Sequence, residues 1–297
     1  MSAPPNPYPN AGWTIVSHRR HRGCRPSNPN PEMEALNVDP VPPSPWTPMD
    51  PCTSPELESK ILCKIKSTIH QLKNSRFYAR VLDRLRCAEI QSSICRALSP
   101  ASGLPMVIYG IGRLASDDFP RIQLALALLL REELPITSIE VFDPVLSASE
   151  CAVLKTLGLT VLVENEMGRR VVSAPTLFFL PHCDAALYDN LLSANWEPAR
   201  LNSIVLLGNS FEAYAHYLSW AGEHYGSEKP RVMARHVMAV RQYVREVAME
   251  ERQEEWKTRH NGNRKKDEES VLESALWDTS WHFFELEDGA NMDILQK

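Results

Sequence analysis

The sequence predicts a Rossmann-like α/β fold: a doubly wound, mostly parallel five-stranded sheet with flanking helices. Five short apolar runs alternate with helix-like stretches, and a small group of polar or glycine residues follows each run. Such near-continuous apolar runs are typical of strands buried on both faces, and helices between them complete a doubly wound sheet. The five runs are Met106–Tyr109, Ile139–Phe142, Val161–Val163, Thr176–Leu180 and Ile204–Leu207.

The first 55 residues are predicted to be a disordered, proline-rich arm. They hold fourteen of the 23 prolines and too little apolar surface to offset the entropy of ordering. The arm contains a basic, tryptophan-containing motif, Gly12–Arg22. We interpret this motif as part of a solvated tail, and the alternatives are an import signal or a contact with an acidic partner.

Residues 56–245 are predicted to form the α/β domain, which begins with two helices. A four-residue apolar spacing from Leu57 to Ile69 predicts the first, and a second is expected over Phe77–Leu98, ending before Pro100. The first helix of the core should start near Asp117, with Pro120 in its first turn.

Later helices are also marked by their ends. Ser147 and Glu150 form a capping pair for the next helix, and Gly158 suits the position after its last turn. Further helices are expected over Ala185–Trp196 and Phe211–Trp220. A long amphipathic helix is predicted beyond Pro230, with valines at 232, 237, 240, 244 and 247 on one face.

Residues 246–297 are predicted to be a charged extension followed by an aromatic C-terminal segment. Glu250–Ser270 is highly charged and is expected to be solvated. The aromatic residues of Ala275–Phe284 suggest that this segment folds back onto the core.

Composition restricts the classes of partner and compartment. The net charge of −5 argues against direct nucleic-acid binding. Seven cysteines without a CxxC pair favour free thiols in a reducing compartment and give no zinc-ligand spacing, so no metal is expected. The apolar stretch Leu124–Leu130 is too short to span a membrane, and the proline-rich N-terminus does not suit a signal peptide. We therefore expect a soluble protein of the cytoplasm and nucleus.

The strand ends of such a sheet lie along one edge, where open α/β folds bind ligands. Gly110-Ile111-Gly112-Arg113-Leu114-Ala115 fits the pattern G-x-G-x-x-A directly after a strand, so Gly110 and Gly112 could admit a nucleotide or S-adenosylmethionine. Asp143 could bind ribose hydroxyls, although it follows Gly112 by 31 positions rather than about 20. The alternative is a glycine turn needed only for packing.

Other polar residues follow the remaining strands. Asn209 and Ser210 could cap the next helix, donate into the crevice, or do both. Glu164 and its neighbours could act as acid–base groups, although loop carboxylates are common. The complete candidate ligand site is Gly110, Gly112, Asp143, Glu164, His182, Asn209 and Ser210, and no catalytic residue is assigned.

Cys183 stands beside His182 after the fourth apolar run, which raises the possibility of a thiol nucleophile. Neighbours in an extended chain point to opposite sides, so adjacency does not create a Cys–His pair. We favour a buried thiol beside a hydrogen-bonded histidine.

Several motifs in order resemble the sensitivity-to-red-light-reduced-like family, strongly over Leu57–Leu218. They include Tyr109–Gly112, Val141–Pro144, Leu157–Leu162, Glu164–Gly168, Phe179–Cys183, Leu187–Leu192, Asn195-Trp196 and Gly208–Phe211, with Gly12–Val16 ahead of the domain. The resemblance implies an SRR-like domain in a regulatory protein. Plant members act in light signalling and the circadian clock, and animal members are linked to rhythm and the regulation of haem synthesis. No catalytic residues are established for the family, so the resemblance assigns none to this chain.

Two functions follow as hypotheses. The first is a non-enzymatic regulatory protein with protein partners, no membrane association and a strand-end crevice that can take a small ligand. The alternative is a nucleotide- or S-adenosylmethionine-dependent enzyme that uses Gly110, Gly112 and Asp143. A third hypothesis, a thiol hydrolase acting through Cys183, is the least favoured.

Overall fold

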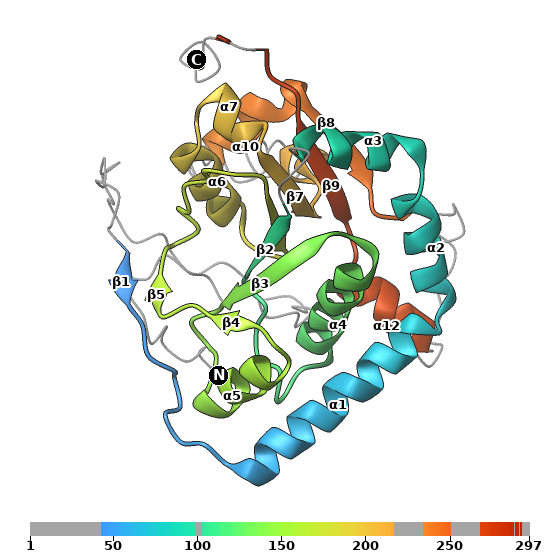
Figure 1. Ribbon diagram of the computed structural model, residues 1–297, viewed down its shortest axis with the longest axis vertical. Coiled ribbons are helices and arrows are strands. Elements are labelled where there is room, and N and C mark those ends of the chain that lie inside the picture. The colour runs from blue at the N-terminus through green and yellow to red at the C-terminus, as the bar shows by residue number, and fades with distance from the viewer. Residues whose placement is uncertain are drawn as a thin grey trace, which may run out of the picture.

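A computed structural model describes residues 43–98, 103–216, 234–250, 268–287, 289, 290 and 292. Its centre is a seven-stranded sheet with the order β4-β3-β2-β6-β7-β9-β8 (Figure 1). The strands are β2 (Leu104–Tyr109), β3 (Ile136–Phe142), β4 (Thr160–Val161), β6 (Thr176–Leu180), β7 (Ile204–Asn209), β8 (Val244–Ala248) and β9 (Thr279–Phe284). All are parallel except β9, which runs antiparallel to both neighbours.

The strand order is that of a Rossmann sheet with one additional strand. Without β9 the order in the chain is 3-2-1-4-5-6, and β9 lies between the fifth and sixth strands. The Rossmann-like prediction is confirmed, whereas the number of five strands is wrong. The two missing strands, β8 and β9, come from the predicted amphipathic helix and from the aromatic segment.

Helices cover both faces of the sheet, and side-chain alternation along the strands divides the core between them. On one face, α4 (Asp118–Glu133), α5 (Ala148–Thr156), α12 (Glu268–Ala275), α2 (Arg76–Leu85) and α3 (Ala88–Ala97) bury residues such as Met106 and Ile108. On the other, α6 (Ala185–Ala194), α7 (Pro198–Leu201) and α10 (Arg235–Val240) bury Val107 and Phe178. Helix α1 (Pro55–Lys73) packs outside α4 and α5 (Figure 1).

The predicted helix ends are largely observed. Pro120 lies in the first turn of α4, and Ser147 and Glu150 form both hydrogen bonds of a capping box on α5. Gly158 follows the last residues of α5 with a φ of 79°, a left-handed conformation that glycine adopts without a steric penalty. Residues 211–216 are helical, and the rest of the helix predicted there lies outside the described residues.

Three other element predictions need correction. The helix expected over Phe77–Leu98 is two helices, because the backbone at Cys87 is extended and α3 turns to pack on β7 and β9. The long helix expected beyond Pro230 ends at Val240, and a short 3₁₀ turn (Arg241–Tyr243) leads into β8. The strand expected over Val161–Val163 ends at Val161.

The arm predicted to end at residue 55 is attached to the domain over its last part. Residues 43–54, named here the N-terminal strap, begin with β1 (Ser44–Pro45), which pairs antiparallel with β5 (Glu164–Asn165). The Trp46 indole donates to the Pro144 carbonyl and its ring lies 5.3 Å from that of Phe142. The predicted motif Gly12–Arg22 lies outside the described residues.

The domain boundary placed at residue 245 also needs correction. It falls within β8, and β9 completes the sheet from the far end of the chain. The aromatic segment therefore belongs to the α/β domain. Most of the charged stretch 250–270 lies outside the described residues.

Candidate functional site

The carboxyl end of β2 leads into residues 110–115, named here the glycine loop. Gly110 and Gly112 have φ values of 72° and 78°, which favour glycine over any other residue. A Cβ atom added to Gly110 would lie 2.5 Å from the Cys183 sulfur. Glycine is therefore needed at position 110 because the Cys183 side chain packs against the turn there.

Two carboxylates hold the backbone of the glycine loop. The Gly112 amide donates to Asp143 Oδ2 (2.7 Å), and the Ala115 amide donates to Glu150 Oε1 (2.9 Å). Each carboxylate also accepts from its own loop: Asp143 Oδ1 from the Val145 amide (2.9 Å) and Glu150 Oε2 from the Ser147 amide (2.8 Å). The amides that would face an anionic ligand in a dinucleotide site are thus bound within the protein.

Burial dominates the electrostatics of these carboxylates. Asp143 is 6% exposed, and burial raises its pKa above the ordinary value although the Val145 and Gly112 amides oppose the rise. Glu150 is 2% exposed and lies close enough to add to the rise. The sequence indicated Asp143 as a ribose ligand, and the structure places its carboxylate against the protein's own backbone.

His182 and Cys183 follow β6 at the same edge. The His182 amide donates to Asn209 Oδ1 (2.9 Å), and its Nε2 lies 3.1 Å from the Trp277 carbonyl oxygen. The Cys183 thiol donates to the carbonyls of Tyr109 (3.3 Å) and Pro181 (3.6 Å). Burial raises the pKa of this thiol well above its usual value, the opposite of the activation that a nucleophilic cysteine needs.

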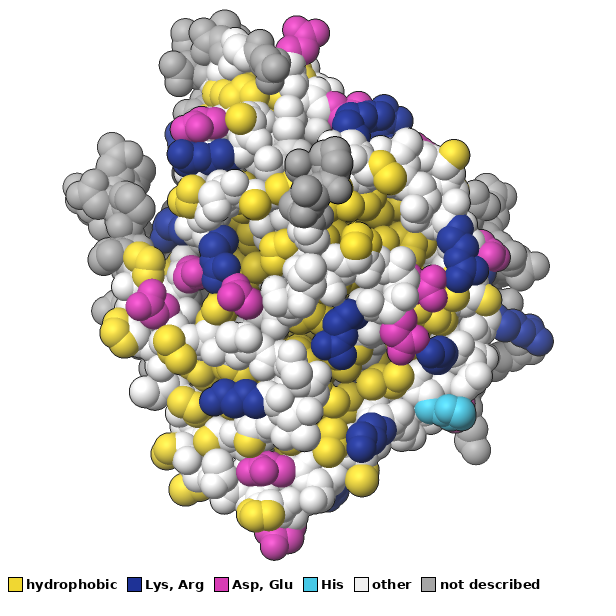
Figure 2. All heavy atoms as spheres, in the orientation of Figure 1, with side chains coloured by type: hydrophobic (Ala, Val, Ile, Leu, Met, Phe, Trp, Pro, Cys, Tyr) yellow, Lys and Arg dark blue, Asp and Glu magenta, His cyan; other side chains and the backbone are white. Residues whose placement is uncertain are grey.

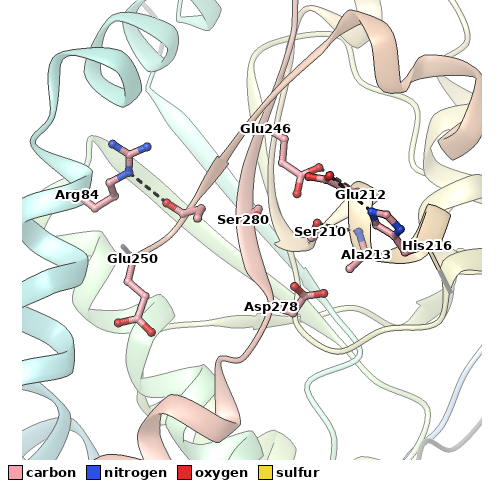
Figure 3. A pocket seen from close by; sticks show the side chains of 10 residues that line it. Arg84, Ser210, Glu212, Ala213, His216, Glu246, Glu250, Asp278 and Ser280 are labelled. Carbon is pink, nitrogen blue, oxygen red and sulfur yellow. Dashed lines mark hydrogen bonds and ion pairs between the residues drawn. The ribbon is translucent and has the colours of Figure 1, made fainter. Parts of the chain in front are cut away.

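Asn209 and Ser210 link the end of β7 to its neighbours. Ser210 Oγ accepts from the Ala213 amide (3.0 Å), which is the predicted capping interaction. Ser210 also lines an open pocket of about 710 Å³ between this helix and the ends of β8 and β9 (Figure 3). Ser210 therefore combines the capping role with a place on a cavity wall.

Glu164 lies away from this arrangement. It is exposed in β5, opposite Pro45 of the strap, because the chain leaves the sheet after Val161. Its neighbour Glu166 instead accepts from the Tyr109 hydroxyl and from Arg170 Nε (2.8 Å). The structure thus brings together six of the seven predicted residues along the carboxyl edge and leaves Glu164 outside.

Sequence reasoning missed the site roles of Glu150 and Glu166. Glu150 was recognised only as a capping residue, and its second partner, Ala115, is 35 positions away. The partner of Glu166, Tyr109, is 57 positions away. Neither contact leaves a signal in local spacing, so only the tertiary structure shows these roles.

The SRR1 domain profile matches residues 87–283, which contain all the parallel strands of the large sheet and all of β9 but its last residue. The chain belongs to the SRR1 domain family. This assignment confirms the resemblance inferred from the ordered motifs.

Two relatives illustrate the range of similarity. Protein SENSITIVITY TO RED LIGHT REDUCED 1 of Arabidopsis thaliana is 36% identical over 242 residues, covering 81% of this chain and 80% of that protein. The SRR1-like protein of Mus musculus is 47% identical over 116 residues, covering 38% of this chain and 47% of that protein.

Two solved structures show a distant likeness. The 23S rRNA methyltransferase ErmE is 13% identical with a TM-score of 0.33, over 69% of this chain and 72% of that one. The plantazolicin methyltransferase BpumL is 10% identical with a TM-score of 0.30, over 78% of this chain and 99% of that one. Likeness at this level carries no inference about activity.

We predict that Asp143→Ala destabilises the fold. Removing this carboxylate leaves two amides without their acceptor, which should lower the free energy of unfolding by about 1–3 kcal/mol in chemical denaturation. Asp83→Ala, at an exposed position on α2, should change it by less than about 0.5 kcal/mol. Equal stability of Asp143→Ala and the wild type would contradict the structural role of this carboxylate.

We predict that Cys183 resists alkylation in the folded protein. Because burial raises the pKa of its thiol, iodoacetamide at pH 8 should modify the exposed Cys52, Cys63 and Cys95 first. Cys183 should react only after denaturation, as measured by mass spectrometry of digested protein. Preferential labelling of native Cys183 would instead support the thiol-nucleophile hypothesis.

Proposed function

We propose that this protein is a non-enzymatic regulator, related in function to the light and circadian regulators that its family resemblance implies. The observation that carries this proposal is the occupation of the glycine-loop amides by Asp143 and Glu150. Family membership supports a regulatory role, and the Arabidopsis relative is named for reduced sensitivity to red light.

The electrostatics of the glycine loop argue against a dinucleotide cofactor. A pyrophosphate at this turn would compete with two carboxylates for the Gly112 and Ala115 amides and would meet their negative charge at short range. The N-terminal strap further covers the loop that follows β3: the Met49 amide donates to the Leu146 carbonyl (3.0 Å), and the Ala148 amide donates to the Asp50 carbonyl (2.8 Å). The strap thus lies against the loop after β3, next to the half of the edge that holds a nucleoside in Rossmann enzymes.

Protein partners and residence in the cytoplasm and nucleus remain part of the proposal. Acidic and basic side chains are interspersed over the face drawn in Figure 2, which suits protein contacts better than a phosphate backbone. The net charge of −5 points the same way. No helix among the described residues has the length and apolar character needed to cross a bilayer.

A second candidate is an S-adenosylmethionine-dependent enzyme. The glycine loop follows the first strand of a sheet with the Rossmann strand order, at the edge where such folds bind ligands. S-adenosylmethionine carries no phosphate, so the carboxylates of the glycine loop oppose it less than they oppose a dinucleotide. Fold alone does not assign a function, and this candidate therefore ranks second.

We predict that the full-length protein restores the red-light response of Arabidopsis plants that lack the relative. The wild-type protein and the variant Arg113→Ala, which alters an exposed side chain on the glycine loop, should restore the response equally well. Restoration by the wild type alone would show that the glycine loop works as a ligand site. Failure of both, with normal protein levels, would contradict the regulatory proposal.

A thermal-shift screen gives the matching biochemical control. S-adenosylmethionine, NAD and ATP at saturating concentration should leave the melting temperature unchanged, whereas a ligand at a hundred times its Kd would add about 2.7 kcal/mol. A clear rise with S-adenosylmethionine, lost in Arg113→Ala, would favour the enzyme instead.

A further inference from the structure

An open pocket of about 710 Å³ lies at the carboxyl ends of β7 and β8, beside the start of β9. This size is within the range of small-ligand sites. Figure 3 shows the side chains that line it, which come from α2, from the helix at 211–216 and from the region of β8 and β9. Its polar lining includes Arg84, Glu212, Glu246, Glu250, Asp278 and Ser280. We name it the β8–β9 pocket.

The groups in this pocket that could bind an anion are already engaged. The first amides of the helix, at Phe211 and Glu212, donate to Glu246 Oε2 (3.1 and 3.3 Å). The Arg84 guanidinium donates to the Ala248 carbonyl (3.4 Å) and forms an ion pair with Glu89 (3.2 Å). An anionic ligand would have to displace Glu246 from the helix amides or Glu89 from Arg84.

The charge of the lining is mainly negative. Four carboxylates, on Glu212, Glu246, Glu250 and Asp278, line it together with the Arg84 guanidinium. Glu250 is already paired with a second guanidinium, that of Arg80 (Nε to Oε2, 2.9 Å), which offsets its charge. His282 Nε2 lies 3.7 Å from Glu246 Oε2, but burial lowers the pKa of His282 to about 4, so the imidazole is neutral near pH 7 and leaves the charge of Glu246 in place.

Ser280 supplies an observation independent of the carboxylates. It is 3% exposed, and its hydroxyl makes no hydrogen bond within the described part of the chain. Its backbone lies between Gly208 of β7 and Ala248 of β8, so the residue is fixed in the middle of three paired strands. A buried hydroxyl on a cavity wall, without a protein partner, is suited to accept a hydrogen bond from a ligand.

The spacing of the acidic groups selects the kind of cation. Among the described residues, no three His, Cys, Asp or Glu side chains are placed to hold a metal ion. A larger organic cation can instead reach several carboxylates and the Ser280 hydroxyl, because ammonium and guanidinium groups each offer several N–H donors.

We propose that the β8–β9 pocket binds an organic cation, an ammonium or guanidinium group, through the Ser280 hydroxyl and the carboxylates of Glu212 and Glu246. The group can belong to a free amine or to a Lys or Arg side chain of a protein partner. This inference goes beyond the regulatory function and stands or fails separately from it.

Isothermal titration of the full-length protein tests the proposal, with agmatine as the free amine and an acetylated, amidated Gly-Arg-Gly peptide as the protein mimic. We expect binding by at least one probe, weakened by higher salt. Ser280→Val, which removes the hydroxyl and fills space, should raise Kd about tenfold or more, since a hydrogen bond to a charged group is lost. Binding by agmatine alone or by the peptide alone identifies the source of the cation.

Two further variants make the result decisive. Glu212→Gln removes an exposed carboxylate from the pocket wall without changing a residue of the sheet, and it should raise Kd a few-fold. The control is Asp83→Asn, at an exposed position outside the pocket, which should leave Kd unchanged. The proposal is overturned if neither probe binds the wild type at millimolar concentration, or if Ser280→Val and Glu212→Gln bind as the wild type does. Tighter binding of inorganic phosphate than of either cation would also overturn it.

Discussion

Two buried carboxylates bind the backbone of the glycine loop, and the carboxyl edge of the sheet is organised around them. Asp143 and Glu150 come from the end of β3 and the first turn of α5, and they accept amides from the chain that follows β2. This ties two neighbouring strand ends and a helix start into one unit. The thiol of Cys183 then packs against the turn at Gly110, and the N-terminal strap covers the loop on the far side of Asp143.

This arrangement divides the edge into two regions with different character. Around β2 and β3, carboxylates, a thiol and the strap bind the backbone at the end of the sheet where a Rossmann enzyme holds its nucleoside. Around β7, β9 and β8, the edge is hollow and acidic, with a buried hydroxyl facing the cavity. The protein can therefore bind a partner or ligand at the ends of β7, β9 and β8 without holding a cofactor at the ends of β2 and β3.

The fold was predictable where burial leaves a local pattern. The runs that became β2, β3, β6 and β7 are apolar on both faces, and the cap at Ser147 follows from adjacent residues. Strand β9 was missed because its partners, β7 and β8, are fixed only by long-range pairing, and the valines of β8 also suit a helical spacing. At the site, the contacts of Asp143 could not be predicted: its carboxylate binds an amide 31 positions away, which no spacing rule reveals. The strap was missed because its prolines suggest disorder, although β1 and Trp46 attach it to the domain.

Amide hydrogen exchange of Gly112 and Ala115, measured by NMR on the free full-length protein, tests the central claim most directly. If Asp143 and Glu150 hold these amides, both should exchange far more slowly than in an unfolded chain without any added ligand. Rapid exchange of both amides in the free protein, with protection appearing only on addition of a nucleotide or S-adenosylmethionine, would contradict the account and show that the glycine loop is an open ligand site.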